Sequence, residues 1–302
     1  MRVIITGGSG LIGRALAESL LSAGSEVIVL SRNPAGVAGF PPRVQVEKWD
    51  GRTAQGWAEL VEDAAIVNLA GENIGAGRWS AERKRRILES RVNAGKAIVQ
   101  AVEAVKHKPR VVIQASGVGY YGAGCDEEAT EYSPPGSDFL AQVCVAWEAS
   151  TAPVEALGVR RAIIRSASVL TPKGGVLPRM LLPFRFYVGG RISHGRQWFP
   201  WIHIADEVAA IRYLVMKGTT RGVFNLASPR PLTNAQFSRL LGEAMHRPAA
   251  VPIPAFALRL AFGEMASLLL EGKRATPQRL LQEGFVFRFH DPEVALQDLL
   301  RR

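Results

Sequence analysis

Arg2-Val-Ile-Ile-Thr-Gly7-Gly-Ser-Gly10-Leu-Ile-Gly13 is the stretch that decides the fold of this chain. After Arg2, its next four residues, Val3 to Thr6, are β-branched and three of them are apolar, which predicts a short buried strand. Leu11 to Ala23 then has helical periodicity, and Glu26 to Leu30 predicts a second strand. Strand, glycine turn, helix and strand in this order predict a βαβ unit that binds a dinucleotide.

The three glycines of this turn have separate functions. One permits a tight turn, one lets the backbone approach a pyrophosphate, and one allows the helix to pack closely on the strand. The N-terminus of the helix then presents N–H groups and a positive dipole end to the phosphates. We therefore expect cofactor contacts from Gly7, Ser9, Gly10, Leu11, Ile12 and Gly13.

The end of the second strand indicates which dinucleotide is bound. NAD sites place an acid there, which accepts a hydrogen bond from the ribose 2′-OH. Here Ser31, Arg32 and Asn33 occupy that place, and no carboxylate follows until Glu47. Because a guanidinium pairs well with a phosphate, the sequence favours NADP(H), with contacts from these three residues.

Composition excludes several classes of protein. The chain has 302 residues, 47% of them hydrophobic, which is enough for a large core. It contains no apolar run of membrane-spanning length and opens directly into a strand, so we expect no signal peptide, no membrane anchor and no membrane partner. Two cysteines, Cys125 and Cys144, without metal-ligand spacing predict a cytoplasmic protein with no disulfide framework and no metal.

The net charge of +10 raises the question of an anionic partner. The densest basic run is Arg83-Lys-Arg-Arg86, early in a helix predicted from about Ser80 to Lys106. A solvated helix face explains this run better than nucleic-acid binding does.

The rest of the chain divides into two parts that differ in composition and sequence pattern. Strands are predicted at Val44–Lys48, Ala64–Leu69, Arg110–Ala115, Val159–Arg165 (running on through Leu170) and Val223–Leu226. Their alternation with helices predicts an α/β fold, a Rossmann-type doubly wound parallel sheet. Proline-rich, mostly helical sequence predicts a smaller C-terminal lobe, with a helix at Val176–Phe186. We expect an NADP-binding domain at 1–170 and 204–227, and a substrate lobe at 171–203 and 228–302.

Several segments resemble the extended short-chain dehydrogenases/reductases. Val67-Asn-Leu-Ala-Gly-Glu72 resembles their fourth-strand turn, Gln114 to Gly122 their fifth strand, and Trp201-Ile-His-Ile-Ala-Asp206 a late stretch of that fold. More narrowly, Gly119-Tyr-Tyr-Gly122 and Gly195-Arg-Gln-Trp-Phe199 resemble an atypical epimerase-like subgroup, some of whose members carry a cell-division-inhibitor-like label. Residues 249–300 are similar to its C-terminal domain of unknown function.

The resemblance implies further cofactor contacts and one important departure. It implies contacts from Leu69, Ala70, Gly71 and Glu72, and it places Arg91 near the active site, where a buried arginine is able to hold a phosphate or carboxylate. In the wider family a Tyr-x-x-x-Lys pair exchanges a proton with the substrate oxygen. At the corresponding helix this chain has Leu140 and Cys144, or Phe139 and Val143 in the neighbouring register. Neither register supplies a phenol or an ammonium group.

One Tyr-x-x-x-Lys does occur, at Tyr213 and Lys217, but it follows the strand that comes after the catalytic pair in the family. We expect Tyr213 to pack and Lys217 to be a cation at a helix C-terminus. The catalytic serine of the family aligns with Ser116, or with Gly117 in another register.

Four residues are candidates for the chemistry. Tyr120 and Tyr121 follow the fifth strand and are phenols of the right type, although packing explains them equally well. His203 titrates near neutral pH, although it lies in an apolar stretch where a hydrogen-bonded core histidine is the commoner outcome. Ser116, which aligns with the catalytic serine of the family in one register, is the fourth candidate. In the second lobe, Arg196, Gln197 and Trp198 suit an anionic or planar substrate.

Two functions remain open at this stage. The first is an NADP(H)-dependent oxidoreductase or epimerase-like enzyme that acts on an unidentified small molecule. The second is a non-catalytic NADPH-binding regulator or redox sensor with a protein partner, which the missing Tyr and Lys favour. A homodimer is compatible with both.

Overall fold

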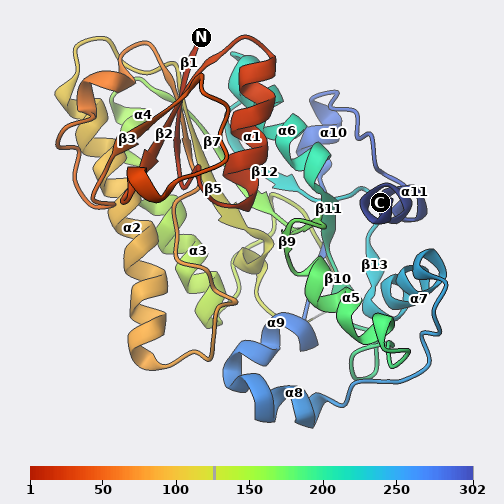
Figure 1. The fold of residues 1–302 in the computed structure, drawn as a ribbon. Coiled ribbons are helices and arrows are strands. Elements are labelled where there is room, and N and C mark those ends of the chain that lie inside the picture. Colours follow the sequence, from red (N-terminus) through yellow and green to blue (C-terminus); the bar gives the residue numbers. More distant parts are fainter. Residues whose placement is uncertain (125–126, 302) are drawn as a thin grey trace.

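A seven-stranded parallel sheet organises the computed structural model, which describes residues 1–124 and 127–301 (Figure 1). The strand order is β12-β7-β5-β4-β1-β2-β3, and every neighbouring pair is parallel. The predicted Rossmann-type doubly wound fold is confirmed. The strands are β1 (Arg2–Thr6), β2 (Glu26–Ser31), β3 (Val44–Lys48), β4 (Ala65–Asn68), β5 (Val111–Gly117), β7 (Arg160–Ser166) and β12 (Gly222–Leu226).

Helices cover both faces of this sheet. α1 (Leu11–Ser22) and α6 (Ile204–Met216) pack together on one face, and α2 (Ala81–Ala104) lies on the other with α3 (Phe139–Ala149) beside it (Figure 1). Side chains alternate between the faces along each strand. Val3 and Ile5 of β1 thus join one hydrophobic core, while Ile4 joins the other.

The strand predicted at Val159–Arg165, running on through Leu170, is in fact two strands. β7 belongs to the large sheet, but β8 (Ser168–Thr171) pairs with β11 (Trp201–His203) and β9 (Gly174–Gly175) in a separate three-stranded sheet. Between them, the Ala167 amide still donates to Leu226, whereas the Ser168 amide donates to Pro200. The change of partner at this point carries the chain out of the large sheet and over its carboxyl end.

The remaining sequence is mostly short helices around a third core. α5 (Leu177–Arg185), α7 (Asn234–Met245) and α11 (Pro292–Leu300) contribute buried residues to this core, which lies beside the carboxyl end of the sheet (Figure 1). The other elements are β6 (Glu128–Ala129), α4 (Pro153–Ala156), β10 (Trp198–Phe199), β13 (Leu232–Thr233), α8 (Ala255–Phe262), α9 (Ser267–Leu270), β14 (Arg274–Ala275) and α10 (Gln278–Gln282), together with four 3₁₀ turns, η1 (Pro34–Gly36), η2 (Ala58–Val61), η3 (Val118–Tyr121) and η4 (Gly263–Ala266).

The described residues lack two features. None of their helices is both long enough and apolar enough to span a bilayer. They also contain no group of three or more His, Cys, Asp or Glu side chains placed to hold a metal ion. Cys125 lies outside the described residues.

Candidate active site

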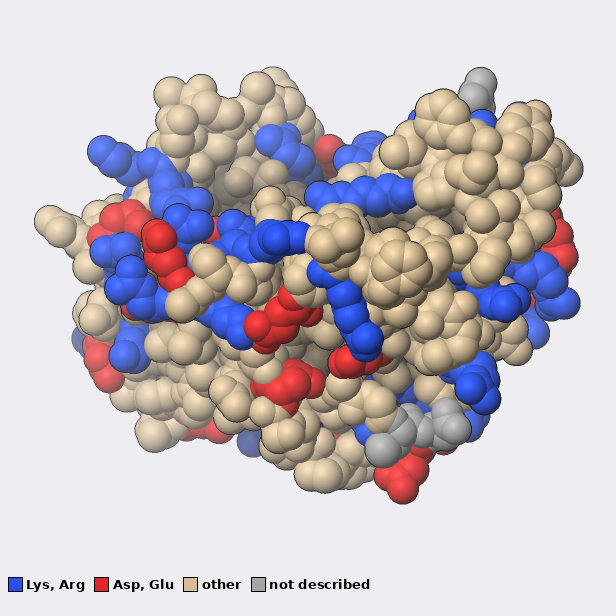
Figure 2. All heavy atoms as spheres, turned by 90° about the horizontal axis from the view of Figure 1, so that it is seen from below, with Lys and Arg blue, Asp and Glu red and all other residues tan. Residues whose placement is uncertain are grey.

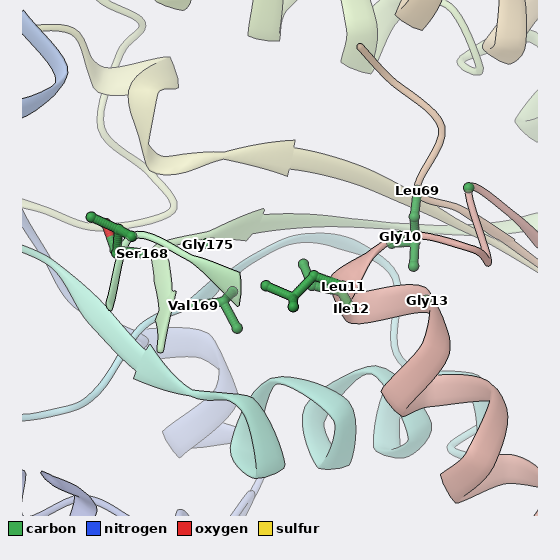
Figure 3. A pocket seen from close by; sticks show the side chains of 10 residues that line it. Gly10, Leu11, Ile12, Gly13, Leu69, Ser168, Val169 and Gly175 are labelled. Carbon is green, nitrogen blue, oxygen red and sulfur yellow. The ribbon is translucent and has the colours of Figure 1, made fainter. Parts of the chain in front are cut away.

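A pocket of about 330 Å³ lies against the glycine turn, at the carboxyl end of β1. Leu11 and Ile12 at the start of α1 approach it from one side, and Ser168, Val169 and Gly175 from the other (Figure 3). The pocket therefore lies between the glycine turn and the segment that leaves the large sheet. Its lining residues are Gly7, Gly10, Leu11, Ile12, Gly13, Leu69, Ser168, Val169, Gly175 and Val176.

The glycines of the turn are required by close backbone approaches. Gly7 has a φ of +67°, and a Cβ there would lie 2.6 Å from the carbonyl oxygen of Leu69. A Cβ on Gly13 would lie 2.5 Å from the Cα of Gly8. The first turn of α1 contains no acidic residue, and no side chain caps it. Its N–H groups therefore remain available to an anion in the pocket.

The end of β2 places an arginine at the surface beside the turn. Ser31 is buried and its hydroxyl accepts from the amide of Asn33, whose side chain caps the 3₁₀ turn η1 by accepting from Gly36. Arg32 is exposed, and its aliphatic stem lies 3.6 Å from where a Cβ on Gly51 would be. The guanidinium is thus presented to solvent at the carboxyl end of β2.

A chain of buried polar side chains crosses the carboxyl ends of β1, β4 and β5. The Thr6 hydroxyl donates to Asn68 at 2.6 Å, and the Asn68 amide donates to Gln114 at 2.9 Å. This chain holds the strand ends in register below the pocket. None of the three residues was identified as functional from the sequence, although polar residues at the ends of apolar strands are the signal for them.

Arg91 reaches from α2 to the segment after β4. Its guanidinium donates to the carbonyls of Glu72 and Ile87 at 3.1 and 3.0 Å, and lies 4.8 Å from the Trp147 ring. A Cβ on Gly71 would come within 2.9 Å of its Cζ atom. Burial lowers the pKa of Arg91 to about 10. The arginine therefore supports the turn formed by Leu69, Ala70, Gly71 and Glu72 and carries its charge to the edge of the site.

A buried ion pair forms the centre of the region at β5 and β7. Arg165 donates to both oxygens of the Glu148 carboxylate, at 2.8 and 2.9 Å. Ser116 donates to the same carboxylate at 2.7 Å. Burial alone would lower the pKa of Arg165, but hydrogen bonding to Glu148 outweighs it and raises that pKa. The guanidinium therefore stays charged, and its two hydrogen bonds to Glu148 form a bidentate pair inside the protein.

The two candidate tyrosines occupy different places around this ion pair. The Tyr121 hydroxyl donates to Asn225 at 2.6 Å and accepts from Arg165 at 3.1 Å, and burial raises its pKa to about 12. Tyr120 is half-buried, and its ring centroid lies 3.3 Å from the Cζ atom of Arg165. Tyr121 is thus part of the buried network, while Tyr120 covers it.

Helix α3 supplies apolar and thiol side chains next to β5. The Cβ of Leu140 lies 3.4 Å from where a Cβ on Gly119 would be, and the Cys144 thiol donates to the Gly117 carbonyl at 3.7 Å. Burial raises the pKa of Cys144, so the thiol stays protonated. Leu140 and Cys144, one of the two registers considered from the sequence, thus lie against the fifth strand and the turn that follows it.

His203 belongs to a different cluster. Its Nδ1 accepts from the Ala205 amide at the start of α6, and its ring stacks on Phe289 at 3.8 Å. Its Nε2 lies 3.3 Å from a carboxylate oxygen of Asp298, and burial lowers its pKa. The described structure gives His203 no hydrogen bond to Ser116, Tyr120 or Tyr121. The sequence-predicted candidates therefore form one group of three and one separate histidine.

Glu207 is a fully buried carboxyl group that the sequence did not single out. The Ser166 hydroxyl donates to its Oε1 at 2.6 Å, and its Oε2 has no protein partner. Burial raises its pKa to about 8, so it is mostly protonated at neutral pH. Glu207 and Arg165 share one sequence signal, a charged residue within an apolar periodic segment.

Three other groups have structural partners. Tyr213 donates to the Glu283 carbonyl and Lys217 pairs with the Glu283 carboxylate at 2.7 Å, which is the packing role expected of this Tyr-x-x-x-Lys. Gln197 is buried and donates to the carbonyls of Ile192 and Leu269. The basic run on α2 is largely ion-paired: Arg83 with Glu72, Lys84 with Glu264, Arg85 with Glu89, and Arg86 with Glu72 and Glu82.

Comparison with known proteins places this geometry in a class. Residues 3–227 match the model of the NAD dependent epimerase/dehydratase family, and residues 253–299 match a domain of unknown function, DUF1731. The chain belongs to this epimerase/dehydratase family, and the resemblance inferred from its motifs is confirmed.

Particular relatives share its whole length. The epimerase family protein YfhF of Bacillus subtilis is 37% identical, with 99% of this chain and 98% of the relative covered. The crystal structure of human epimerase family protein SDR39U1 (isoform 2) with NADPH is 34% identical, covers 99% of both chains and has a TM-score of 0.88. A UDP-glucose 4-epimerase from Thermus thermophilus, solved with NAD, shares the fold at 19% identity, with a TM-score of 0.77 and coverage of 99% and 97%.

Proposed function

We propose that the chain is an NADP(H)-binding, atypical short-chain dehydrogenase/reductase that acts on a small molecule. The observation that carries the proposal is the pairing of an uncapped, glycine-lined helix N-terminus with an exposed arginine, and no acid, at the end of β2. The structure of its human relative with NADPH supports the choice of cofactor. Arg32 would hold the 2′-phosphate, with Ser31 and Asn33 shaping the loop around it.

The pocket suits the remainder of such a cofactor. The backbone of Gly7–Gly13 would hold the pyrophosphate, and Leu69, just after β4, also lines the pocket; Ala70, Gly71 and Glu72 of the same turn would contact the cofactor beside it. When bound, the nicotinamide supplies the hydride chemistry. The chain itself would orient the ring against Val169 and Gly175 and exclude water. We also propose that residues 171–203 and 228–302 form the lobe that receives the substrate.

Proton transfer in this reaction requires a donor other than the Tyr-x-x-x-Lys pair of the wider family. We propose that Leu140 and Cys144 replace the Tyr and Lys of the wider family, and that Tyr120 is the best placed of the four candidates to exchange a proton. The hydroxyls of Ser116 and Tyr121 already donate to Glu148 and Asn225, and His203 caps α6. The Tyr120 carbonyl accepts from the Gly136 amide, but its phenol has no hydrogen-bond partner among the described residues, which leaves that phenol free for a ligand.

The alternative is a non-catalytic NADPH-binding regulator with a protein partner. What favours it is the apolar and thiol character of Leu140 and Cys144, because neither lowers the pKa of a neighbouring phenol. In that case, cofactor binding would fix the position of the second lobe, and the partner protein would respond to that position.

Two measurements separate these functions. Titration with NADPH and with NADH, followed by nicotinamide fluorescence, tests the cofactor, and failure to bind either one would refute both. Turnover of NADPH with a panel of small carbonyl compounds then tests the enzyme. Tyr120→Phe is expected to abolish turnover while retaining NADPH binding, and Tyr132→Phe, at a tyrosine that is 71% exposed, is the matched control. NADPH binding without turnover of any compound favours the regulator.

A further inference from the structure

Exposed apolar side chains gather in two segments of the second lobe. Among the described residues, eight of the fifteen large hydrophobic side chains that are exposed lie between residues 182 and 188 or between 251 and 262. Phe256 and Leu260 on α8 are 73% and 75% exposed, and α8 has no buried residue at all. We call the set the α5–α8 surface: Leu182, Phe186, Tyr187, Val188, Val251, Phe256, Leu260 and Phe262.

The two segments form one surface. The Val251 amide donates to the Gly189 carbonyl at 3.1 Å, and the Ile253 amide to Arg191 at 2.9 Å. Ile192 and Ile253 also form a parallel bridge. The chain that leaves α5 therefore runs beside the chain that enters α8, and both helices lie at the same end of the molecule (Figure 1).

Contacts with the first domain hold α8 in this position. The Arg78 guanidinium donates to the carbonyls of Leu260 and Ala261 at the end of α8. Lys84 of α2 pairs with Glu264 just beyond it. Because these interactions use the backbone at the helix end, the Phe256 and Leu260 side chains stay exposed while the helix stays anchored.

The chain segments that carry this surface contain basic residues and no acidic ones. No Asp or Glu occurs between Glu155 and Asp206, where there are eight Lys and Arg, and none occurs between Glu243 and Glu264. Exposed Arg185, Arg191 and Arg259 are in these acid-free stretches, and Arg247 stacks over the Tyr187 ring at 4.4 Å. Seen from the end that carries α8, blue side chains cross the middle of the face between broad tan areas, with some red side chains beside them (Figure 2).

We propose that the α5–α8 surface docks on an anionic lipid bilayer, with α8 lying in the interface plane. Large apolar side chains on a helix face, flanked by arginines and without acids, are the composition of a segment that lies on a membrane rather than across it. The apolar side chains enter the boundary of the acyl chains, and the arginines pair with lipid phosphates. Docking on a membrane surface requires no membrane-spanning helix, and none of the described helices is able to span a bilayer.

Other partners fit the surface less well. A two-fold dimer would place this patch against itself and bring its arginines together without acids to neutralise them. A nucleic acid would use the arginines and aromatic rings, but would leave Leu182, Val188, Val251 and Leu260 without an apolar environment. An anionic bilayer satisfies both the charge and the aliphatic side chains.

Cosedimentation with vesicles tests this proposal on the full chain. One vesicle preparation contains equal parts of phosphatidylglycerol and phosphatidylcholine, and the other contains phosphatidylcholine alone. We expect the protein to sediment with the anionic vesicles only, and less so as salt increases. Phe256→Ser with Leu260→Ser should weaken this binding by about tenfold or more, because two inserted side chains are lost.

Val286→Ser is the matched control, because Val286 is 84% exposed but lies outside the surface. It is expected to bind vesicles like the wild type. Leu182→Ser with Val188→Ser provides a second test on α5 in case the α8 variant misfolds, which circular dichroism and the melting temperature would reveal. The proposal is overturned if the wild type ignores anionic vesicles, or if folded α8 and α5 variants bind as well as the control. It is also overturned if the wild type does not bind vesicles but forms a dimer in analytical ultracentrifugation, and the α8 variant is a monomer.

Discussion

Two regions at the carboxyl end of the same sheet are built in opposite ways. The glycine turn between β1 and α1 is made of backbone: its features are a positive φ at Gly7, free N–H groups and contacts too close for a Cβ. The region around β5, β7 and α3 is made of buried charged and polar side chains, with Glu148 and Arg165 at its centre.

The difference lies in where the information for each region is held. The turn uses seven consecutive residues, so its geometry is local and its sequence signature is specific. In the second region Ser116, Glu148 and Arg165 come from three separate elements, and each is an ordinary residue in its own segment. A site built from backbone can be predicted from a local sequence motif. A site built from side chains that are distant in the sequence can be recognised only once the fold is known.

The largest effect is expected from breaking the ion pair. Glu148→Leu leaves the Arg165 guanidinium buried without an anion, and should reduce the free energy of unfolding by about 3–5 kcal/mol in urea denaturation. Replacing both partners, Glu148→Leu with Arg165→Met, should recover much of that loss. A double variant that is no more stable than the single one would show that the charge is not the cause.

The exposed pair of Arg239 and Glu243 provides the control for that experiment. The two side chains are 3.8 Å apart and are 69% and 61% exposed. Glu243→Leu should therefore cost less than about 1 kcal/mol.

Filling the glycine turn is the matching test of the other region. Gly13→Ala places a Cβ 2.5 Å from the Cα of Gly8, which the backbone cannot avoid without moving. We expect a loss of about 1–3 kcal/mol in stability and a marked loss of NADPH affinity, measured by denaturation and fluorescence titration. Gly218→Ala is the control, because nothing lies within 4 Å of its added Cβ. If Gly13→Ala bound NADPH like this control, the turn would not be the phosphate site.

A pH series tests the buried side chains further. Because burial raises the pKa of Glu207 from 4.5 to about 8, the folded state holds a proton there that the unfolded state releases. Its contribution to stability therefore falls as pH rises from about 4.5 to about 8 and is level above that range. Glu207→Gln keeps a side-chain oxygen for Ser166 but cannot ionise. Its melting temperature should vary less than that of the wild type over this range, and parallel curves would contradict a buried, protonated Glu207.

The smallest effect is expected at the surface of the cofactor site. Arg32→Asp changes an exposed side chain, so the melting temperature of the protein without cofactor should stay the same. Its affinity for NADPH should fall by about tenfold or more, because a carboxylate replaces the guanidinium beside the phosphate. Arg43→Asp, a second exposed arginine, provides the matched control. An unchanged preference for NADPH over NADH would remove Arg32 from the site.

Much of the fold was predictable from local patterns. The predicted bounds of β3, Val44–Lys48, agree with the structure, and α2 begins at Ala81, next to the start predicted at about Ser80. The break at Ala167 was not predicted, because strand-forming residues continue from Val159 to Leu170 and a change of strand partner leaves no mark in the local sequence pattern. The roles of Arg165 and Glu207 were likewise missed, since a charged residue is recognised as buried only when its partners are known.

The sequence by itself determined the parallel sheet, the glycine turn and the lack of an acid after β2. These depend on residues adjacent in the chain, whose propensities and spacing act over a few ångströms. Only the tertiary structure decided that Ser116 and Tyr121 donate to buried partners, that His203 belongs to another cluster, and that α8 keeps its apolar face exposed. Those outcomes depend on packing between distant segments, because burial and partners, rather than residue type, set what a polar or apolar side chain does.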